Sequence, residues 1–217
     1  MGDIQKELET LVEQMPAFPV SVQRVLSLSA DINCAPKDLV RVINHDPVLT
    51  MRILKVANSS YFGLNQRISS INHAVVYIGI NTVKHLAIAI ATIGMLPRGN
   101  REGFDADAFL LHALTTASVS RLLAAELGIF GMATTDFFIA GLLHDIGQVV
   151  LNIFDSSKCQ QVLHMVKTQG TPITEAEQHL FGMDHCEVGG FLGDRWNFPE
   201  TITEAIRFHH DPMASDK

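Results

Sequence analysis

The sequence is short of charged residues, aromatic residues and cysteines. Only 18% of its 217 residues are charged and 7% are aromatic, whereas 47% are hydrophobic. A chain with so large an apolar fraction is expected to fold around a core, which excludes an intrinsically disordered protein. The three cysteines, Cys34, Cys159 and Cys186, are odd in number and widely spaced. They favour a reducing, cytoplasmic compartment over a disulfide framework.

An excess of basic charge and long apolar runs are also lacking. The 16 Lys and Arg residues against 23 Asp and Glu residues give a net charge of −7. Negative charge repels phosphate backbones, so no nucleic-acid partner is expected. The longest mostly apolar run, Leu86–Leu96, is eleven residues, fewer than the about 20 that a membrane-spanning helix needs. No membrane partner is therefore expected, and the acidic N-terminus does not have the pattern of a signal peptide.

Apolar residues recur at helical spacing along nearly the whole chain. The first stripe consists of Ile4, Leu8, Leu11 and Val12, at i, i+4, i+7 and i+8. Since no stretch alternates convincingly as a strand does, the pattern predicts an all-α fold. In the second half it predicts helices at about 105–127, 135–154, 156–169, 172–181, 184–196 and 199–209.

One polar segment rich in helix breakers, Pro97–Gly103, interrupts this pattern. It predicts two packed helical lobes, with an N-terminal lobe over 1–97, a linker over 98–104 and a second lobe over 105–217. In the first lobe, Asp46 is expected to cap the helix that Pro47 opens, and Asn58 to turn the chain out of it. The alternative is a ligand or partner groove with Tyr61 and Phe62 as apolar anchors.

The residues suited to chemistry lie in the second half, which holds seven of the ten histidines. His144 and Asp145 are adjacent in the apolar stretch AGLLHDIGQVVL, His112 lies in the preceding long helix, and His209 and His210 end a later one. Imidazoles and a carboxylate from separate helices can hold a divalent metal in a helical bundle. The other interpretation is a hydrogen-bonded polar cluster in the core, since a lone histidine on an apolar face is usually that.

Several long segments resemble the HDOD family, a subgroup of the HD superfamily of metal-dependent phosphohydrolases. AGLLHDIGQVVL resembles the HD helix, and FGMDHCEVGGFLGDRWNFPETITEAIRFHHDP resembles the segment that follows it. In the first half, DPVLTMRILKVANSSYFG and INHAVVYIG are similar to the HDOD signature. The resemblance covers about residues 11–212 and implies an all-helical bacterial signalling module with an HD-like C-terminal lobe.

The resemblance also implies a set of metal ligands. His112 matches the first histidine of the superfamily pattern, and His144 with Asp145 matches the dyad, in which Asp145 would bridge two metals. The extra histidines of the HD-GYP relatives are matched by His185, His209 and His210. The implied cofactor is a divalent metal, Fe, Mn or Zn, and a metal-free module is the alternative.

Two departures bear on catalysis. Gln148 stands where catalytic members carry lysine, so a phosphate would meet a neutral donor instead of a positive charge. The superfamily's last aspartate ligand has no counterpart, because Asp211 and Asp216 follow the His209–His210 doublet too closely. We therefore expect a signalling module that binds protein partners or a nucleotide ligand, without efficient catalysis. A metal-dependent phosphohydrolase acting on a nucleotide or cyclic dinucleotide is the alternative, and the oligomeric state is left open.

Overall fold

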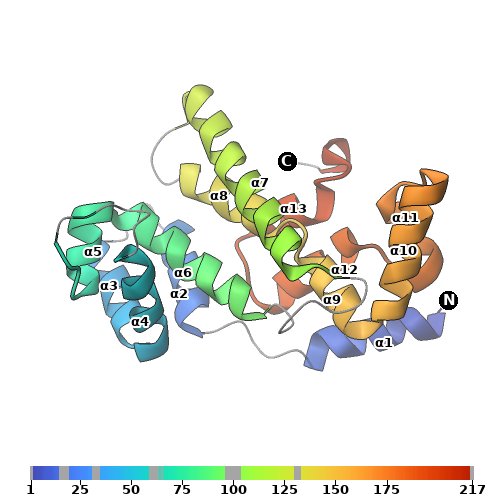
Figure 1. Ribbon diagram of the computed structural model, residues 1–217, viewed down its shortest axis with the longest axis horizontal. Coiled ribbons are helices and arrows are strands. Elements are labelled where there is room, and N and C mark those ends of the chain that lie inside the picture. The colour runs from blue at the N-terminus through green and yellow to red at the C-terminus, as the bar shows by residue number, and fades with distance from the viewer. Residues whose placement is uncertain are drawn as a thin grey trace. The chain divides into compact units, whose positions relative to one another are not determined.

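The computed structural model describes residues 2–14, 20–30, 35–58, 64, 66–95, 104–129 and 133–215. These residues form α-helices and one short 3-10 helix, with no extended strand among them (Figure 1). The all-α expectation is confirmed.

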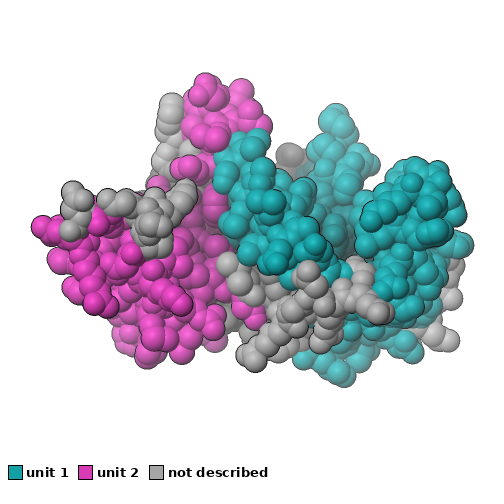
Figure 2. Space-filling view, viewed as in Figure 1, with its two compact units in different colours: residues 1–17, 96–119, 140–217 teal, residues 18–95, 120–139 magenta. Residues whose placement is uncertain are grey.

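The chain divides into two compact units, each made of separated segments (Figure 2). Unit 1 comprises residues 1–17, 96–119 and 140–217, and unit 2 comprises residues 18–95 and 120–139. The lobes expected from the sequence, 1–97 and 105–217, are contiguous, and their boundaries stay a prediction. Of the expected linker 98–104, all but Phe104 lies outside the described residues.

Unit 2 contains residues 120–139 and the helices of the first half of the chain other than the first. They are α2 (Val20–Ala30), α3 (Pro36–Asn44), α4 (Pro47–Ala57), α5 (Ile71–Ile78) and α6 (Ile80–Met95). Helix α6 packs against α2, α4 and α5, and Val25, Ile53 and Ile88 are fully buried between them. The unit therefore has an apolar core of its own.

The turns at both ends of α4 follow the sequence expectation. Asp46 accepts a 2.9 Å hydrogen bond from the Leu49 backbone N–H, which confirms it as the N-cap. The Asn58 side chain donates to the Leu54 and Ile68 carbonyl oxygens and accepts from the Ile68 N–H. Asn58 thereby ties the end of α4 to the segment before α5. The alternative anchors, Tyr61 and Phe62, lie outside the described residues.

Unit 1 contains α1 (Gly2–Gln14) and the helices of the second half. These are α7 (Ala106–Glu126, up to residue 119), α8 (Ala133–Leu143, from residue 140), α9 (Ile146–Phe154), α10 (Ser156–Gln169), α11 (Ile173–Phe181), α12 (His185–Arg195), α13 (Glu200–Phe208) and the 3-10 helix η1 (Pro212–Ala214). Helix α12 is central, because α1, α9, α11 and α13 all pack against it. Trp196 follows the last residue of α12 and is buried.

The helix expected at 135–154 is in fact two helices. α8 ends at Leu143, His144 and Asp145 form a turn, and α9 begins at Ile146. Continuous apolar periodicity concealed this break, since both helices bury apolar residues on either side of it. The dyad thus lies at a junction between helices and not inside one.

Two segments are long and apolar enough to cross a membrane, judged by length and composition alone. They are Ala106–Glu126 and Asp136–Phe154, and the bent pair Ile71–Ile78 and Ile80–Ala91 would be a third if taken as one span. The length of the longest apolar run did not reveal these segments. Scattered polar residues interrupt a run, although the mean hydropathy of the whole helix stays high. Within the structure, 67% of the Asp136–Phe154 window is buried.

Candidate metal centre

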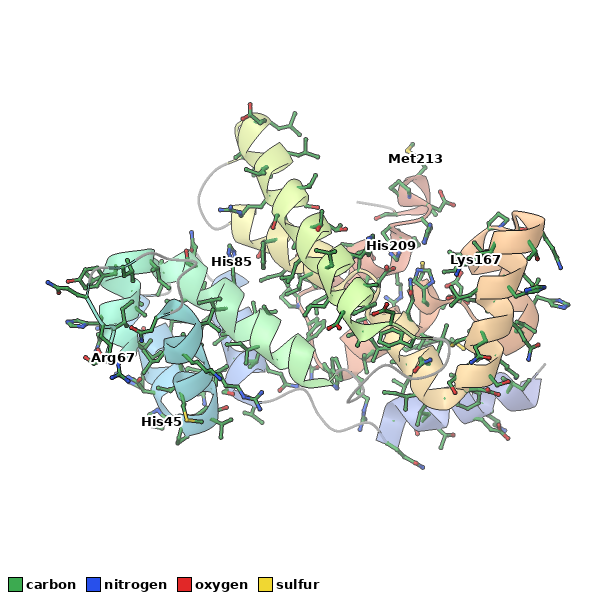
Figure 3. The ribbon with its side chains drawn as sticks, in the orientation of Figure 1. His45, Arg67, His85, Lys167, His209 and Met213 are labelled. Atoms are coloured by element: carbon green, nitrogen blue, oxygen red, sulfur yellow. The ribbon has the colours of Figure 1, made fainter. Side chains whose placement is uncertain are left out.

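Unit 1 brings all six candidate ligands into one region. They come from α7 (His112), the α8–α9 turn (His144, Asp145), the first residue of α12 (His185) and the end of α13 (His209, His210). Figure 3 labels His209, which follows the last residue of α13. Residues separated by nearly one hundred positions in the sequence thus surround one carboxylate.

Each carboxylate oxygen of Asp145 faces two imidazole nitrogens. Oδ2 lies 3.2 Å from His112 Nε2 and 3.3 Å from His144 Nε2. Oδ1 lies 3.3 Å from both His185 Nε2 and His209 Nε2. Within each pair the two nitrogens are 3.1 Å apart. The arrangement is therefore two imidazole pairs joined by one carboxylate.

The other ring nitrogens fix how these imidazoles point. His144 Nδ1 donates to the Gly141 carbonyl and His209 Nδ1 to the Ile206 carbonyl, both at 2.9 Å. A carbonyl oxygen can only accept, so these Nδ1 atoms carry the proton and a neutral ring has its lone pair on Nε2. The Nδ1 atom of His185 is 2.6 Å from Glu177 Oε2. A metal-ligating histidine usually has its second nitrogen bonded in this way.

The donor set fits a divalent cation. The Nδ1 atoms of His185 and His209 are bonded to acceptors, so in the neutral state their Nε2 lone pairs face each other across 3.1 Å and repel unless a positive charge lies with them. Two nitrogens bound to one ion at about 2.1 Å lie roughly 3.0–3.4 Å apart for angles between about 90° and 110°. Both observed pairs fall in that range. Imidazole and carboxylate ligands suit zinc, iron and manganese.

The pKa values of the cluster also indicate a need for positive charge. Burial opposes ionisation of Asp145, but hydrogen bonds from His144, His185 and His209 hold the pKa of its carboxyl far below the usual range. Burial likewise opposes charge on His185, yet Asp145, Cys186 and Glu177 raise its pKa to about 12. Without a metal, protons on the imidazoles supply the charge that the carboxylates need.

Exposure differs strongly among the four imidazoles around Asp145. The His112 side chain is 55% exposed, whereas those of His144, His185 and His209 are 12%, 0% and 17% exposed. His210 is exposed, and its ring lies 4.5 Å from that of His209 and 5.1 Å from that of His185, centroid to centroid. It therefore lies at the edge of the cluster.

Close helix crossings bring these residues together. A Cβ on Gly147 would lie 1.9 Å from the His185 carbonyl oxygen, so the starts of α9 and α12 meet in backbone contact. A Cβ on Gly141 would lie 2.8 Å from the Cα of Ala117, so α8 and α7 approach as closely. Only small residues permit such approaches. The first crossing places Asp145 beside His185, and the second places His144 beside His112.

Two residues of the site were not predicted from the sequence. Glu177 is buried and binds both the backbone N–H and the Nδ1 of His185. The sequence could have indicated Glu177 by its position. Ile173, Glu177 and Phe181 share one helical face, so a carboxylate lies in an apolar stripe. Cys186 lies against the His209 ring, although its sequence position beside His185 said nothing about geometry.

Comparison with known proteins agrees with the resemblance seen in the sequence. The family model described as "HDOD domain" matches residues 15–212. A solved HDOD domain protein with unknown function from Geobacter sulfurreducens is 30% identical, with a TM-score of 0.83 over 99% of this chain and 71% of that one. A solved protein from Shewanella amazonensis SB2B, named "Putative phosphohydrolase", is 28% identical, with a TM-score of 0.77 over 96% of this chain and 73% of that one.

A curated relative is much longer than this chain. An "Uncharacterized protein" of Treponema pallidum (strain Nichols) is 28% identical over 210 residues, which is 95% of this chain and 39% of that protein. The chain therefore spans about two fifths of the length of this relative.

Proposed function

The chain belongs to the HDOD domain family, and from this premise we propose that it is a regulatory module of bacterial signal transduction in the cytoplasm. The imidazole–carboxylate cluster holds a divalent ion, iron, manganese or zinc. The module acts by binding a nucleotide-type ligand or another signalling protein, without efficient catalysis. The observation that carries the metal is the placement of four Nε2 atoms within 3.3 Å of the two Asp145 oxygens.

A bound divalent ion would supply a Lewis acid, able to polarise a phosphoryl oxygen and lower the pKa of water. The protein's own groups prepare the place for it. Asp145 offers one oxygen to each imidazole pair, Glu177 holds His185 in one ring orientation, and the Ile206 carbonyl does the same for His209. Because these partners are buried or part of the backbone, the lone pairs converge before any ion arrives.

Gln148, which follows Gly147 in the stretch HDIGQ, favours binding of a phosphate over its hydrolysis. Gln148 lines a cavity of about 40 Å³ with Phe104, Asn152 and Cys159. Its amide is neutral, so it offers less stabilisation than a lysine to the charge that develops on a transferring phosphoryl group. The departure from the lysine that catalytic members of the superfamily carry is thus what favours binding of a phosphate over its cleavage.

A metal-dependent phosphohydrolase is the second candidate. It is favoured by the position of Asp145 between two imidazole pairs, which would hold divalent ions. Such ions would stabilise the negative charge that develops on a phosphodiester during hydrolysis. The 28% identical Shewanella amazonensis protein, whose name refers to phosphohydrolases, agrees with this alternative.

Elemental analysis and turnover assays decide between the candidates. Protein purified without chelator should contain iron, manganese or zinc, and should show no turnover of cyclic dinucleotides or generic phosphodiesters. His144→Ala should lose the metal. His164→Ala is the matched control, because His164 is exposed on α10 in the same unit.

Three outcomes are distinct. Metal without turnover supports the regulatory module. Metal with turnover that His144→Ala abolishes makes the protein a phosphohydrolase. No metal after incubation with each of the three ions, and unchanged behaviour of His144→Ala, would reduce the cluster to a polar part of the core.

A further inference from the structure

Cys186 lies inside the ligand cluster. It is the second residue of α12 and is 5% exposed. Its Sγ atom is 3.8 Å from Nδ1 and 3.9 Å from Nε2 of His209. One ligand atom from each of His185, Cys186, His209 and His210 can be chosen so that all lie within 4.8 Å of one another. The thiol is therefore within reach of an ion held by these imidazoles.

Among the residues that the structure describes, no disulfide accounts for this position. Cys186 and Cys159 are both free thiols. A buried cysteine can pack as a small apolar group against an aromatic ring. That role needs only the sulfur's volume, whereas thiolate sulfur and imidazole nitrogen are both ligand types that zinc binds in proteins.

The distances are compatible with coordination. Bonds of about 2.3 Å to sulfur and about 2.05 Å to nitrogen put the two atoms about 3.6 Å apart around a tetrahedral ion. The observed 3.9 Å from Sγ to His209 Nε2 exceeds this by a few tenths of an ångström. Because Sγ lies at nearly the same distance from both nitrogens of the His209 ring, the Cys186 side chain would have to turn towards Nε2 to bind the same ion.

We propose that Cys186 is a thiolate ligand, so that the pair His185–His209 forms a sulfur-containing half of the centre that prefers a thiophilic divalent ion such as zinc. This inference rests on the proposed metal site and adds a selectivity to it. The other half, His112 with His144 and Asp145, offers only nitrogen and oxygen. The two halves therefore differ in ligand softness.

Cobalt(II) tests the thiolate directly, without any assay of activity. Cobalt-loaded wild-type protein should show visible d–d bands and a near-ultraviolet sulfur-to-cobalt charge-transfer band. Cys186→Ser and Cys186→Ala should lose the charge-transfer band and keep the d–d bands. Cys159→Ser is the matched control and should keep both, since Cys159 lies on α10, outside the cluster.

X-ray absorption of the zinc-loaded wild-type protein gives a test that needs no variant. A sulfur shell at about 2.3 Å, beside nitrogen at about 2.0–2.1 Å, is expected. Cys186→Ser should also weaken zinc binding by about 10–100-fold, the range known for outer-shell changes and a lower bound for a lost ligand. Its affinity for manganese should change by less.

The result separates this inference from the proposed function. Cobalt d–d bands without a charge-transfer band, or a nitrogen-only zinc shell, would overturn the thiolate ligand and leave the metal site standing. Absence of any bound cobalt or zinc would overturn both. A charge-transfer band that persists in Cys186→Ser and vanishes in Cys159→Ser would identify Cys159 as the sulfur ligand and overturn the proposal.

Discussion

Glu177 decides the direction in which His185 presents its free nitrogen. One oxygen of this buried carboxylate accepts from the His185 backbone N–H and contacts the ring Nδ1. The ring is thus fixed by a residue on α11, eight positions earlier in the chain. At the residue scale, the centre depends as much on this orienting contact as on the groups that face Asp145.

Replacing Glu177 with Gln should weaken metal binding by about 10–100-fold, because an amide is a poorer orienting acceptor for His185 Nδ1. Zinc affinity measured by competition with a chromophoric chelator checks this. Glu175→Gln, at an exposed position on the same helix, should bind zinc as the wild type does. Equal affinities for all three proteins would contradict the orienting role.

A second residue-scale prediction concerns His85 in unit 2. Burial, with the positive charges of Arg121 and Lys84, lowers its pKa to about 4, and its ring stacks on Phe138. The unfolded state therefore binds the proton more tightly, so His85 stabilises the fold fully above about pH 6.5 and loses that contribution as the pH falls towards 4.

Between pH 7 and pH 5, His85 should lower the free energy of unfolding by about 1–2 kcal/mol. Urea unfolding of the wild type and of His85→Leu at both pH values measures the difference, and groups titrating elsewhere are common to both proteins. Parallel pH dependences would show that this imidazole is not buried in its neutral form.

At the scale of elements, helix periodicity predicts most of unit 1 but not its convergence. The helices from α10 to α13 begin and end within about one residue of the positions that apolar spacing and caps indicate. The break at His144–Asp145 could not be read from that spacing, since residues on both sides of it are apolar. Sequence context singled out the candidate ligands other than His185, which came from the family resemblance, and spacing alone left a polar core cluster equally open.

The crossing of α9 and α12 should be the least tolerant point of unit 1. Gly147→Ala would drive a Cβ into the His185 carbonyl oxygen and force the helices apart. We expect a loss of about 1–3 kcal/mol in the free energy of unfolding, together with loss of metal binding. Urea unfolding and zinc titration measure the two effects.

Gly94→Ala provides the contrast. Gly94 lies in α6, and among the described residues a Cβ there would meet Arg52 Nη1 alone, at 3.7 Å. Alanine is a better helix former than glycine, so this change should leave stability unchanged or raise it by about 0.5–1 kcal/mol. If both substitutions had the same effect, the close crossing would not limit the fold.

At the scale of the whole molecule, two compact units share one chain while the candidate ligands lie in one of them. A ligand that binds only the folded state stabilises it by about 2.7 kcal/mol at one hundred times its Kd. The stabilisation from metal should therefore appear first in unit 1.

Hydrogen exchange with and without zinc tests this distribution. Amides of α9 and α12 should exchange more slowly with zinc, and a chelator should reverse the change, whereas amides of α5 and α6 should be unaffected. Equal slowing in both groups of helices would mean that unit 2 responds to the ion as well.

The uneven exposure of the imidazoles has a kinetic consequence. An ion between His112 and His144 borders a side chain that is 55% exposed, while His185 in the other pair is fully buried. The first ion would exchange with the solution quickly and the second slowly. Brief dialysis should therefore remove one equivalent of metal and leave the other. The number of ions bound would then depend on the time since the protein was last exposed to free metal.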